Sequence, residues 1–353
     1  MSHFCLLRRP DEYVAADLDL ASDAPSREYW LERFVNHFET VLHHALSCYG
    51  RSARSRIEAA RRQLAAMAET LRGDPAALPG GKLNVMELGR ARDKVLRDHG
   101  LNDPFAQVKQ RHNAAALPLY PEAVHKLHVM DDEAKWLHLI ECVFAGNLFD
   151  VGSETAVQSA CETSFLELVK NVKPRPWLVD DYDRLAEDLL PGPPAKWHQA
   201  VVFIDNAGSD FILGVMPFVR ELALRGTRVV LAANERPVLN DLTADETAEI
   251  VDRLAAADED LAALISGQML EVVSTGNDLA LIDLADVSDE LNAAAAEADL
   301  VILEGMGRAI ESNFNATFIV DSLHLALLKD PHVAARIGGE MNDCVCRYVP
   351  AEA

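Results

Sequence analysis

Residues 201–243 read VVFIDNAGSDFILGVMPFVRELALRGTRVVLAANERPVLNDLT, and this stretch decides the fold of the 353-residue chain. An apolar run stops at Asp205, an amphipathic segment follows as far as Gly226, and a second β-branched run begins at Val229. This order predicts a strand, a polar turn, a helix and a second strand, which together form one βαβ unit. The two strands should be parallel neighbours joined by a right-handed crossover.

Polar side chains follow both strands of this unit. Asp205 and Asn206 come directly after the first strand, and Asp241 follows the second. The carboxyl ends of neighbouring parallel strands meet at one edge of the sheet, where open α/β folds bind ligands. Carboxylate and amide oxygens are hard ligands that suit Mg²⁺ or Mn²⁺. Alternatively, Asp205 and Asn206 cap the intervening helix and Asp241 caps the next one, and spacing alone leaves both interpretations open.

Strand-like and helical segments alternate through the rest of the second half of the chain. We expect strands at 269–274, 299–303, 323–328 and 344–349, and helices at 287–298 and 331–337. Strands interleaved with helices predict an α/β protein, with a mostly parallel sheet covered on both faces.

The first half of the chain has a mainly helical pattern. Apolar residues recur at helical spacing within 29–42, 51–72, 85–99, 104–116, 131–144 and 151–168. The strongest turn signal of the chain, Pro-Gly-Pro-Pro at 191–194, follows these segments. We therefore predict a mostly α-helical domain at 1–192 and an α/β/α metal-binding catalytic domain at 193–353.

Composition limits the classes of partner. A net charge of −23 argues against binding to nucleic acid or to an anionic membrane, because phosphates would be repelled. A small phosphorylated substrate is compatible with this net charge, since a metal ion and a few cationic side chains can make the electrostatic potential inside one pocket positive. Six cysteines without a CxxC pair, no signal-peptide pattern and no membrane-length apolar run predict a cytoplasmic protein. The sequence indicates no oligomeric state.

Further chemical candidates lie outside the βαβ unit. The loop Glu304-Gly305-Met306-Gly307-Arg308 directly follows a buried strand-like run. There the glycines would let a ligand approach the backbone, Glu304 could act as an acid or base, and Arg308 could hold an anion. A tight turn with a surface arginine fits the same pattern. Lys329 ends another strand-like run and could meet a phosphate.

A cation at this sheet edge favours phosphate ester hydrolysis. It would neutralise the phosphoryl oxygens while a nucleophile attacks in line with the leaving alcohol. The nucleophile would be either Asp205 itself or a metal-bound water. We take Asp205, Asp210 and Glu304 as the candidate catalytic carboxylates. The chain contains no phosphate-binding loop of the GxxxxGK[ST] type, no HExxH pair and no GxSxG elbow.

Several long segments, in the right order, resemble the metal-dependent damage-control phosphatase family. The resemblance is narrower still to the 4′-phosphopantetheine phosphatase domain at the carboxyl end of pantothenate kinase-like proteins. The segments are FIDNAGSDFILGVMPFVRELALRGTRVVLAANERPVLNDLT, DLVILEGMGRAIESNFNA, FAGNLFD, DPFAQVKQRHNAAAL, RPWLVDDY and REYWLERF. They cover nearly the whole chain.

This resemblance implies a fold and a cofactor. The fold is an α-helical amino-terminal part over a Rossmann-like, three-layer α/β/α core. The cofactor is a divalent metal (Mn²⁺, Co²⁺, Ni²⁺ or Mg²⁺), and the family's ligands fall on Asp205, Asn206 and Asp241. These are the groups that the βαβ unit already brings together.

The resemblance also implies a substrate side of the site. Gly305 and Arg308 belong to a substrate-side loop, Lys329 matches a lysine that faces phosphate, and Asn147 and Asp150 fall at the helical wall of the site. The implied reaction removes phosphate from 4′-phosphopantetheine or from its oxidised, damaged forms and so limits coenzyme A synthesis. Because a kinase half has no counterpart here, we expect a free-standing phosphatase.

Three rival functions stay open at this point. Related branches dephosphorylate sugar phosphates. An S-adenosylmethionine-dependent carboxyl methyltransferase would need a glycine-rich loop after the first core strand, whereas this chain has Asp205-Asn206-Ala207-Gly208 there. A non-catalytic module that senses coenzyme A precursors would tolerate the loss of Asp241.

Overall fold

The computed structural model describes residues 2–148, 165–191 and 195–352, and its centre is a seven-stranded sheet in the order β1-β7-β6-β5-β2-β3-β4. Neighbouring strands are parallel except β6 and β7, which are antiparallel. The sheet is therefore mostly parallel, as predicted. Its strands are β1 (Val179–Asp180), β2 (Gln199–Phe203), β3 (Arg228–Ala233), β4 (Leu270–Ser274), β5 (Leu300–Glu304), β6 (Asp321–Leu327) and β7 (Cys344–Val349).

The predicted βαβ unit is present. Strand β2 leads through a π-helical turn, η4 (Asp210–Val215), into α10 (Met216–Leu224) and then into β3. The strands β2 and β3 pair in parallel, which confirms the expectation from the sequence. Gly226 has a φ of +102°, a conformation that favours glycine, and it lets the chain turn from the end of α10 towards β3.

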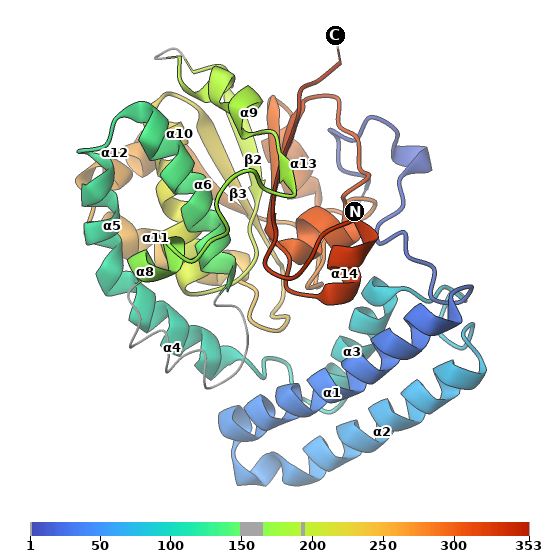
Figure 1. The fold of residues 1–353 in the computed structure, drawn as a ribbon. Helices are drawn as coiled ribbons and strands as arrows, with labels where there is room; N and C mark the ends of the chain where they lie inside the picture. Colours follow the sequence, from blue (N-terminus) through green and yellow to red (C-terminus); the bar gives the residue numbers. More distant parts are fainter. Residues whose placement is uncertain (1, 149–164, 192–194, 353) are drawn as a thin grey trace.

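Helices cover both faces of the sheet, and the alternation of side chains along each strand explains why (Figure 1). In β2, Val202 packs into the core of one face, whereas Val201 and Phe203 pack into the core of the other. This arrangement confirms the three-layer α/β/α prediction. The first face is covered by α5 (Tyr120–Leu127), α6 (Asp132–Leu148), α8 (Phe165–Val169), α9 (Tyr182–Leu189), α10, α11 (Ala244–Ala255) and α12 (Glu259–Ser266). The second face is covered by α13 (Asp289–Ala295), the π-helical turn η5 (Gly307–Ser312), α14 (Pro331–Arg336) and the amino-terminal segment.

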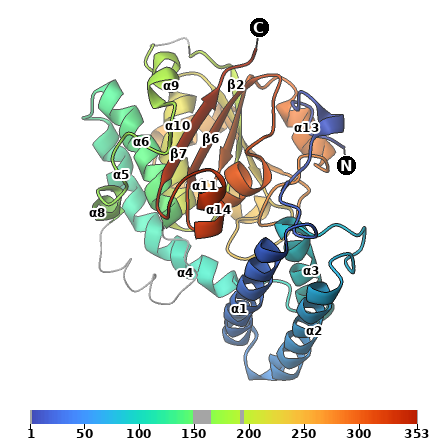
Figure 2. The same cartoon turned by 45° about the vertical axis from the view of Figure 1, so that its right-hand side comes forward.

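A separate helical unit projects from one end of this α/β body (Figures 1 and 2). Its helices α1 and α3 start at caps whose side chains accept backbone hydrogen bonds: Asp23 accepts from Ser26 and Asn84 accepts from Glu87. The unit has its own apolar core, and α4 connects it to the body. Its elements are α1 (Ala24–Tyr49), η2 (Arg51–Ala53), α2 (Arg54–Gly73) and α3 (Val85–Asp98), and α4 (Ala106–Ala116) follows them. The short helix η1 (Pro10–Glu12) lies beside the α/β body, and η3 (Leu117–Leu119) joins α4 to α5 (Figure 1).

The sequence patterns placed some boundaries differently. The helix expected at 29–42 runs over 24–49, and the one expected at 287–298 is limited to 289–295. Most of the helix expected at 151–168 lies outside the described residues. The domain boundary at residue 192 stays a prediction, although β1 and α6 already belong to the α/β body before it.

No helix among the described residues combines enough length with enough apolar character to cross a membrane.

Candidate active site

The acidic groups lie where the order of the sheet reverses. Strand β2 is flanked by β3 on one side and by β5 on the other, so the connections leave the centre in opposite directions. Ligands bind at such switch points in open α/β sheets. Asp205 follows β2 and Glu304 ends β5, and the backbone N–H of Asp205 donates to Oε2 of Glu304 at 3.1 Å. Both residues are buried, and Glu304 is only 1% exposed.

Two amide side chains hold three carboxylates together. Carboxylate oxygens of Asp205, Asp210 and Glu304 lie within 4.8 Å of one another. Asn206 donates from Nδ2 to Asp205 and Asp210, both at 2.9 Å. Asn147 donates from Nδ2 to Glu304 at 2.9 Å and to Asp210 at 3.1 Å. The predicted residues of β2, β5 and α6 therefore meet in one buried cluster.

A buried arginine joins this cluster to Asp241. Arg308 is 1% exposed, and its guanidinium pairs with Asp205 and, at 2.9 Å, with Asp241. Asn234 also donates to Asp241 at 3.3 Å. The sequence suggested that Arg308 could hold an anion. In the structure, its guanidinium contacts two carboxylates of the protein itself.

The electrostatics of the cluster favour a cation. Four buried carboxylates (Asp205, Asp210, Asp241 and Glu304) lie around the single guanidinium of Arg308. Burial, and then the charges of Asp210 and Asp205, raises the pKa of Glu304 well above its usual range. An excess of buried negative charge with hard oxygen donors fits a divalent metal ion. Asn147 Oδ1 is buried and accepts no hydrogen bond from any residue that the structure describes.

The capping interpretation of the acidic groups is wrong. The helix α11 is capped by Thr243, whose side chain forms a capping box with Glu246, so Asp241 is not its cap. The turn η4 begins after Ser209 without a side-chain cap. Asp205 and Asp241 thus contact Arg308 instead of a helix end.

Two glycines allow the close approach of these groups. Gly305 has a φ of +90°, and a Cβ there would overlap the carboxylate of Asp205. Gly146 lies against η4, and a Cβ there would come within 2.8 Å of the Cα of Asp210. Because Gly146 lets α6 pack so closely, the next residue, Asn147, reaches the cluster.

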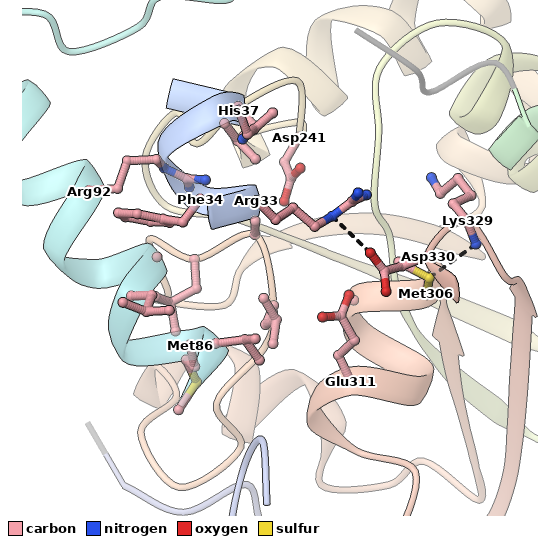
Figure 3. A pocket seen from close by; sticks show the side chains of 18 of the residues that line it. Arg33, Phe34, His37, Met86, Arg92, Asp241, Met306, Glu311, Lys329 and Asp330 are labelled. Atoms are coloured by element: carbon pink, nitrogen blue, oxygen red, sulfur yellow. Dashed lines mark hydrogen bonds and ion pairs between the residues drawn. The ribbon is translucent and has the colours of Figure 1, made fainter. Parts of the chain in front are cut away.

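A cavity of about 260 Å³ lies beside the cluster, between the α/β body and the helical unit (Figure 3). Asp205, Asn206 and Asp241 line it on the side of the sheet edge. Much of the remaining wall is apolar and consists of Phe34, Val85, Met86, Leu88, Leu239, Leu279, Leu281 and Met306. Polar and charged side chains also reach it, namely Arg33, His37, Arg92, Glu311, Lys329 and Asp330.

The helical wall carries little net charge. Arg92 pairs with Asp93 at 2.7 Å, and Arg33 pairs with Asp330 at 2.8 Å. Its position in the cavity wall, together with Arg92 and Arg33, lowers the pKa of His37. The wall opposite the acidic cluster therefore suits an uncharged part of a ligand.

Asp330 ties the helical unit to the loop that carries Lys329. Asp330 is 1% exposed, and it accepts from the hydroxyl of Tyr29 at 2.8 Å and from Arg33 at 2.8 Å. It also caps α14 by accepting from the backbone of His332 and Val333. Figure 3 shows the Arg33–Asp330 pair beside Lys329. The position of α1 and the position of this loop are thus fixed together.

The structure brings most of the predicted site residues together. The buried cluster contains Asn147, Asp205, Asn206, Asp210, Asp241, Glu304 and Arg308, with Gly305 against it. Lys329 lines the adjoining cavity. Asp150 lies outside the described residues.

Arg33, Glu311 and Asp330 are among the cavity residues that sequence reasoning missed. The sequence does contain a signal for Asp330, because an aspartate directly before a proline is typical of the start of a helix. In the structure, Asp330 caps α14. Arg33 lines the cavity from α1 and pairs there with this distant residue. No local pattern announces such a contact.

The chain was compared with known proteins. The model of the damage-control phosphatase ARMT1-like domain matches residues 30–345. A damage-control phosphatase of Arabidopsis thaliana is 39% identical over 92% of this chain and 88% of its own length. Pantothenate kinase 2 of the same plant is 39% identical over 98% of this chain, and the 4′-phosphopantetheine phosphatase of Mus musculus is 32% identical over 97%.

The extent of these matches differs between relatives. This chain spans only 42% of the plant kinase and 48% of the mouse phosphatase. Among solved structures, a DUF89 family protein of Pyrococcus horikoshii has the same fold, with a TM-score of 0.65, 17% identity and coverage of 90% of this chain and 96% of that protein. The family match over most of the sequence confirms the resemblance found in its motifs. The chain belongs to the damage-control phosphatase family that is defined by the ARMT1-like domain.

Proposed function

We propose that this protein is a metal-dependent phosphatase that hydrolyses the phosphate monoester of 4′-phosphopantetheine or of its oxidised forms. In doing so it would limit coenzyme A synthesis in the cytoplasm. The observation that carries this proposal is the buried carboxylate cluster, which lies at the switch point of the sheet and opens onto a cavity. The names of the mouse and Arabidopsis relatives support the same reaction class.

The cation would be held by the residues that face the cavity. Asp205, Asn206 and Asp241 line the cavity and offer carboxylate and amide oxygens, which suit Mn²⁺, Co²⁺, Ni²⁺ or Mg²⁺. Asp210 and Glu304 lie behind them and hold Asn206 and the backbone of Asp205 by hydrogen bonds. When bound, the metal supplies Lewis acidity that neutralises the phosphoryl oxygens.

The protein's own residues would orient the ester. Lys329, which lines the same cavity as Asp205 and Asp241, would pair with a phosphoryl oxygen. Arg308 would keep Asp205 and Asp241 in position through its two ion pairs. These contacts bring the phosphate to the acidic side of the cavity and leave the rest of the substrate on the other side.

The helical wall supports a substrate with an uncharged, partly apolar arm. Phe34 and Met86 line it, Leu281 adds an apolar side chain from the loop between β4 and α13, and the arginines of the wall are paired with carboxylates. The pantetheine arm has this character, with amides and methyl groups, whereas a sugar has hydroxyl groups around a ring. The methyltransferase alternative is not favoured either, because the turn after β2 places Asp205 and Asn206 where that class needs a glycine-rich loop.

The test is phosphate release by metal-stripped protein to which Mn²⁺, Co²⁺, Ni²⁺ or Mg²⁺ is added back in turn. The substrates would be 4′-phosphopantetheine, its S-oxidised forms and several sugar phosphates. We expect a cation to restore turnover of the pantetheine esters. Restored turnover of sugar phosphates alone would overturn the substrate assignment. No turnover with any cation would overturn the phosphatase proposal and favour a binding module.

A further inference from the structure

Glu311 is a carboxylate of the cavity that has no place in the buried cluster. It lies in the turn η5 and lines the cavity together with Lys329 and Asp330. Figure 3 shows its carboxylate pointing towards that of Asp330. Asp330 is engaged by Tyr29, by Arg33 and by the start of α14. Glu311, in contrast, forms no side-chain hydrogen bond or ion pair within the described parts of the chain.

The surroundings of Glu311 favour a carboxyl group that keeps its proton up to neutral pH. Burial and then the charge of Asp330 raise its pKa to about 7, while Arg33, Lys329 and Arg336 oppose this rise. Asp330 accepts a hydrogen bond from Tyr29 and pairs with Arg33, whereas Glu311 has neither contact. Near neutral pH, Glu311 therefore exists in both protonation states, as a general acid requires.

A second cavity reaches Glu311 from its other side. This cavity has a volume of about 250 Å³ and is lined by Glu311, Asp17, Phe314 and Arg336, among others. Asp17 and Arg336 pair with each other at 2.8 Å, so neither replaces Glu311 as a proton donor. Glu311 thus lies between the substrate cavity and a separate space, through which solvent could return a proton.

We propose that Glu311 is a catalytic residue: the general acid that protonates the leaving alcohol oxygen of the phosphate ester. This inference rests on the proposed phosphatase function. In the step, the attacking oxygen forms a new bond to phosphorus while the bond between phosphorus and the ester oxygen breaks. The ester oxygen takes the electron pair of that bond and the proton of the Glu311 carboxyl group. Glu311 is left as a carboxylate and regains a proton from water.

The chemistry of the substrate explains why an acid is needed. An alkyl alcohol such as the end of a pantetheine arm is a poor leaving group as an alkoxide, so its departure depends on protonation. A nitrophenolate is stable without a proton. A general acid typically contributes about 100-fold to 10,000-fold to such a step. A missing acid should consequently slow the two ester types to very different extents.

The test compares Glu311→Gln with the wild-type protein on 4′-phosphopantetheine and on 4-nitrophenyl phosphate, with the metal that gives the highest activity. We expect kcat for the alkyl ester to fall at least about 100-fold. The loss of kcat for the aryl ester should be smaller than this by a factor of at least about ten. The wild-type kcat for the alkyl ester should decline above about pH 7, as Glu311 loses its proton, and the variant should lack this decline. Glu340→Gln, at an exposed position outside both cavities, is the matched control and should behave as the wild type.

The outcomes separate the two proposals. An equal loss of kcat for both esters, or an unchanged pH profile, would overturn the role of Glu311 and leave the phosphatase assignment intact. Absence of turnover of both esters by the wild-type protein would instead overturn the proposed function. Circular dichroism of Glu311→Gln should match the wild type, and a variant that fails to fold would be replaced by Glu311→Asp. That variant keeps the acid and should keep the decline at high pH, although at a lower rate.

Discussion

The buried cluster at the sheet edge and the wall of the cavity opposite it are built in different ways. The carboxylates of the cluster come from the ends of β2 and β5 and are held by Asn147, Asn206 and Arg308. The opposite wall comes from α1, α3 and the loops after β3 and β4, and much of it is apolar. The positions of the cluster carboxylates depend on the topology of the sheet. The position of the opposite wall depends on how the helical unit packs against the α/β body. The difference suggests that reaction chemistry and substrate choice can be changed separately.

Asp205→Asn should have the largest effect on activity. Asp205 belongs to the buried carboxylate cluster, lines the cavity as one of the proposed metal ligands, and pairs with Arg308. We expect kcat to fall on the order of 1,000-fold or more for every phosphate ester tested. The measurement is phosphate release with saturating metal. Asp299→Asn is the matched control, since Asp299 precedes β5 at the opposite edge of the same sheet. Activity within tenfold of the wild type in Asp205→Asn would show that the cluster is not the reaction centre.

Gly305→Ala should have the second largest effect, with a loss of about 100-fold in kcat. A Cβ at this position would displace the carboxylate of Asp205, and the φ of +90° adds backbone strain. Gly338→Ala separates the two causes, because Gly338 also has a positive φ, +78°, but its Cβ would meet no neighbour within 4 Å. Steady-state kinetics and the melting temperatures of both variants would be compared. Similar loss of activity in both would mean that strain alone explains the effect.

The comparison also explains what the sequence could predict. Asp205, Asn206 and Asp241 could be placed together because parallel neighbouring strands end at the same edge of a sheet. Glu304 could be added because it ends a further apolar run. The pairing of Arg308 with two of these carboxylates was not predicted, since its loop was compatible with a surface arginine.

Elements outside the main pattern were harder to find. Strand β1 has only two residues at the sheet edge and is too short to show a periodicity. The start of α11 did carry a signal, a capping box between Thr243 and Glu246. The contact of Tyr29 with Asp330 joins residues 301 positions apart, and no local rule predicts it. Glu311 likewise resembles an ordinary helical glutamate until the cavity beside it is known.

Met86→Ala should change substrate choice more than chemistry. Met86 lies on α3 in the apolar wall, and its truncation removes contacts to the uncharged arm of a ligand. We expect KM for 4′-phosphopantetheine to rise about tenfold, because a methionine side chain contributes about 1–3 kcal/mol to such binding. KM for 4-nitrophenyl phosphate should rise much less. Met67→Ala is the matched control, since Met67 packs against the core of the same helical unit but does not line the cavity. An equal rise for both esters would show that the wall does not select the arm.

Glu311→Gln should have the smallest effect on the folded state, and its sign depends on pH. The amide side chains of Asn147 and Asn206 donate hydrogen bonds to carboxylates of the cluster, whereas no amide side chain donates to Glu311 within the described residues. With a pKa raised from 4.5 to about 7, Glu311 binds more protons in the folded than in the unfolded chain between these values. Its contribution to stability is therefore fully present below pH 4.5 and is lost as the pH rises through 7. Relative to the wild type, the melting temperature of Glu311→Gln should be about 2 °C higher at pH 8 and no higher at pH 4.5. Differential scanning calorimetry at the two pH values gives the answer, and the same difference at both would mean that the carboxyl group of Glu311 titrates as it does in water.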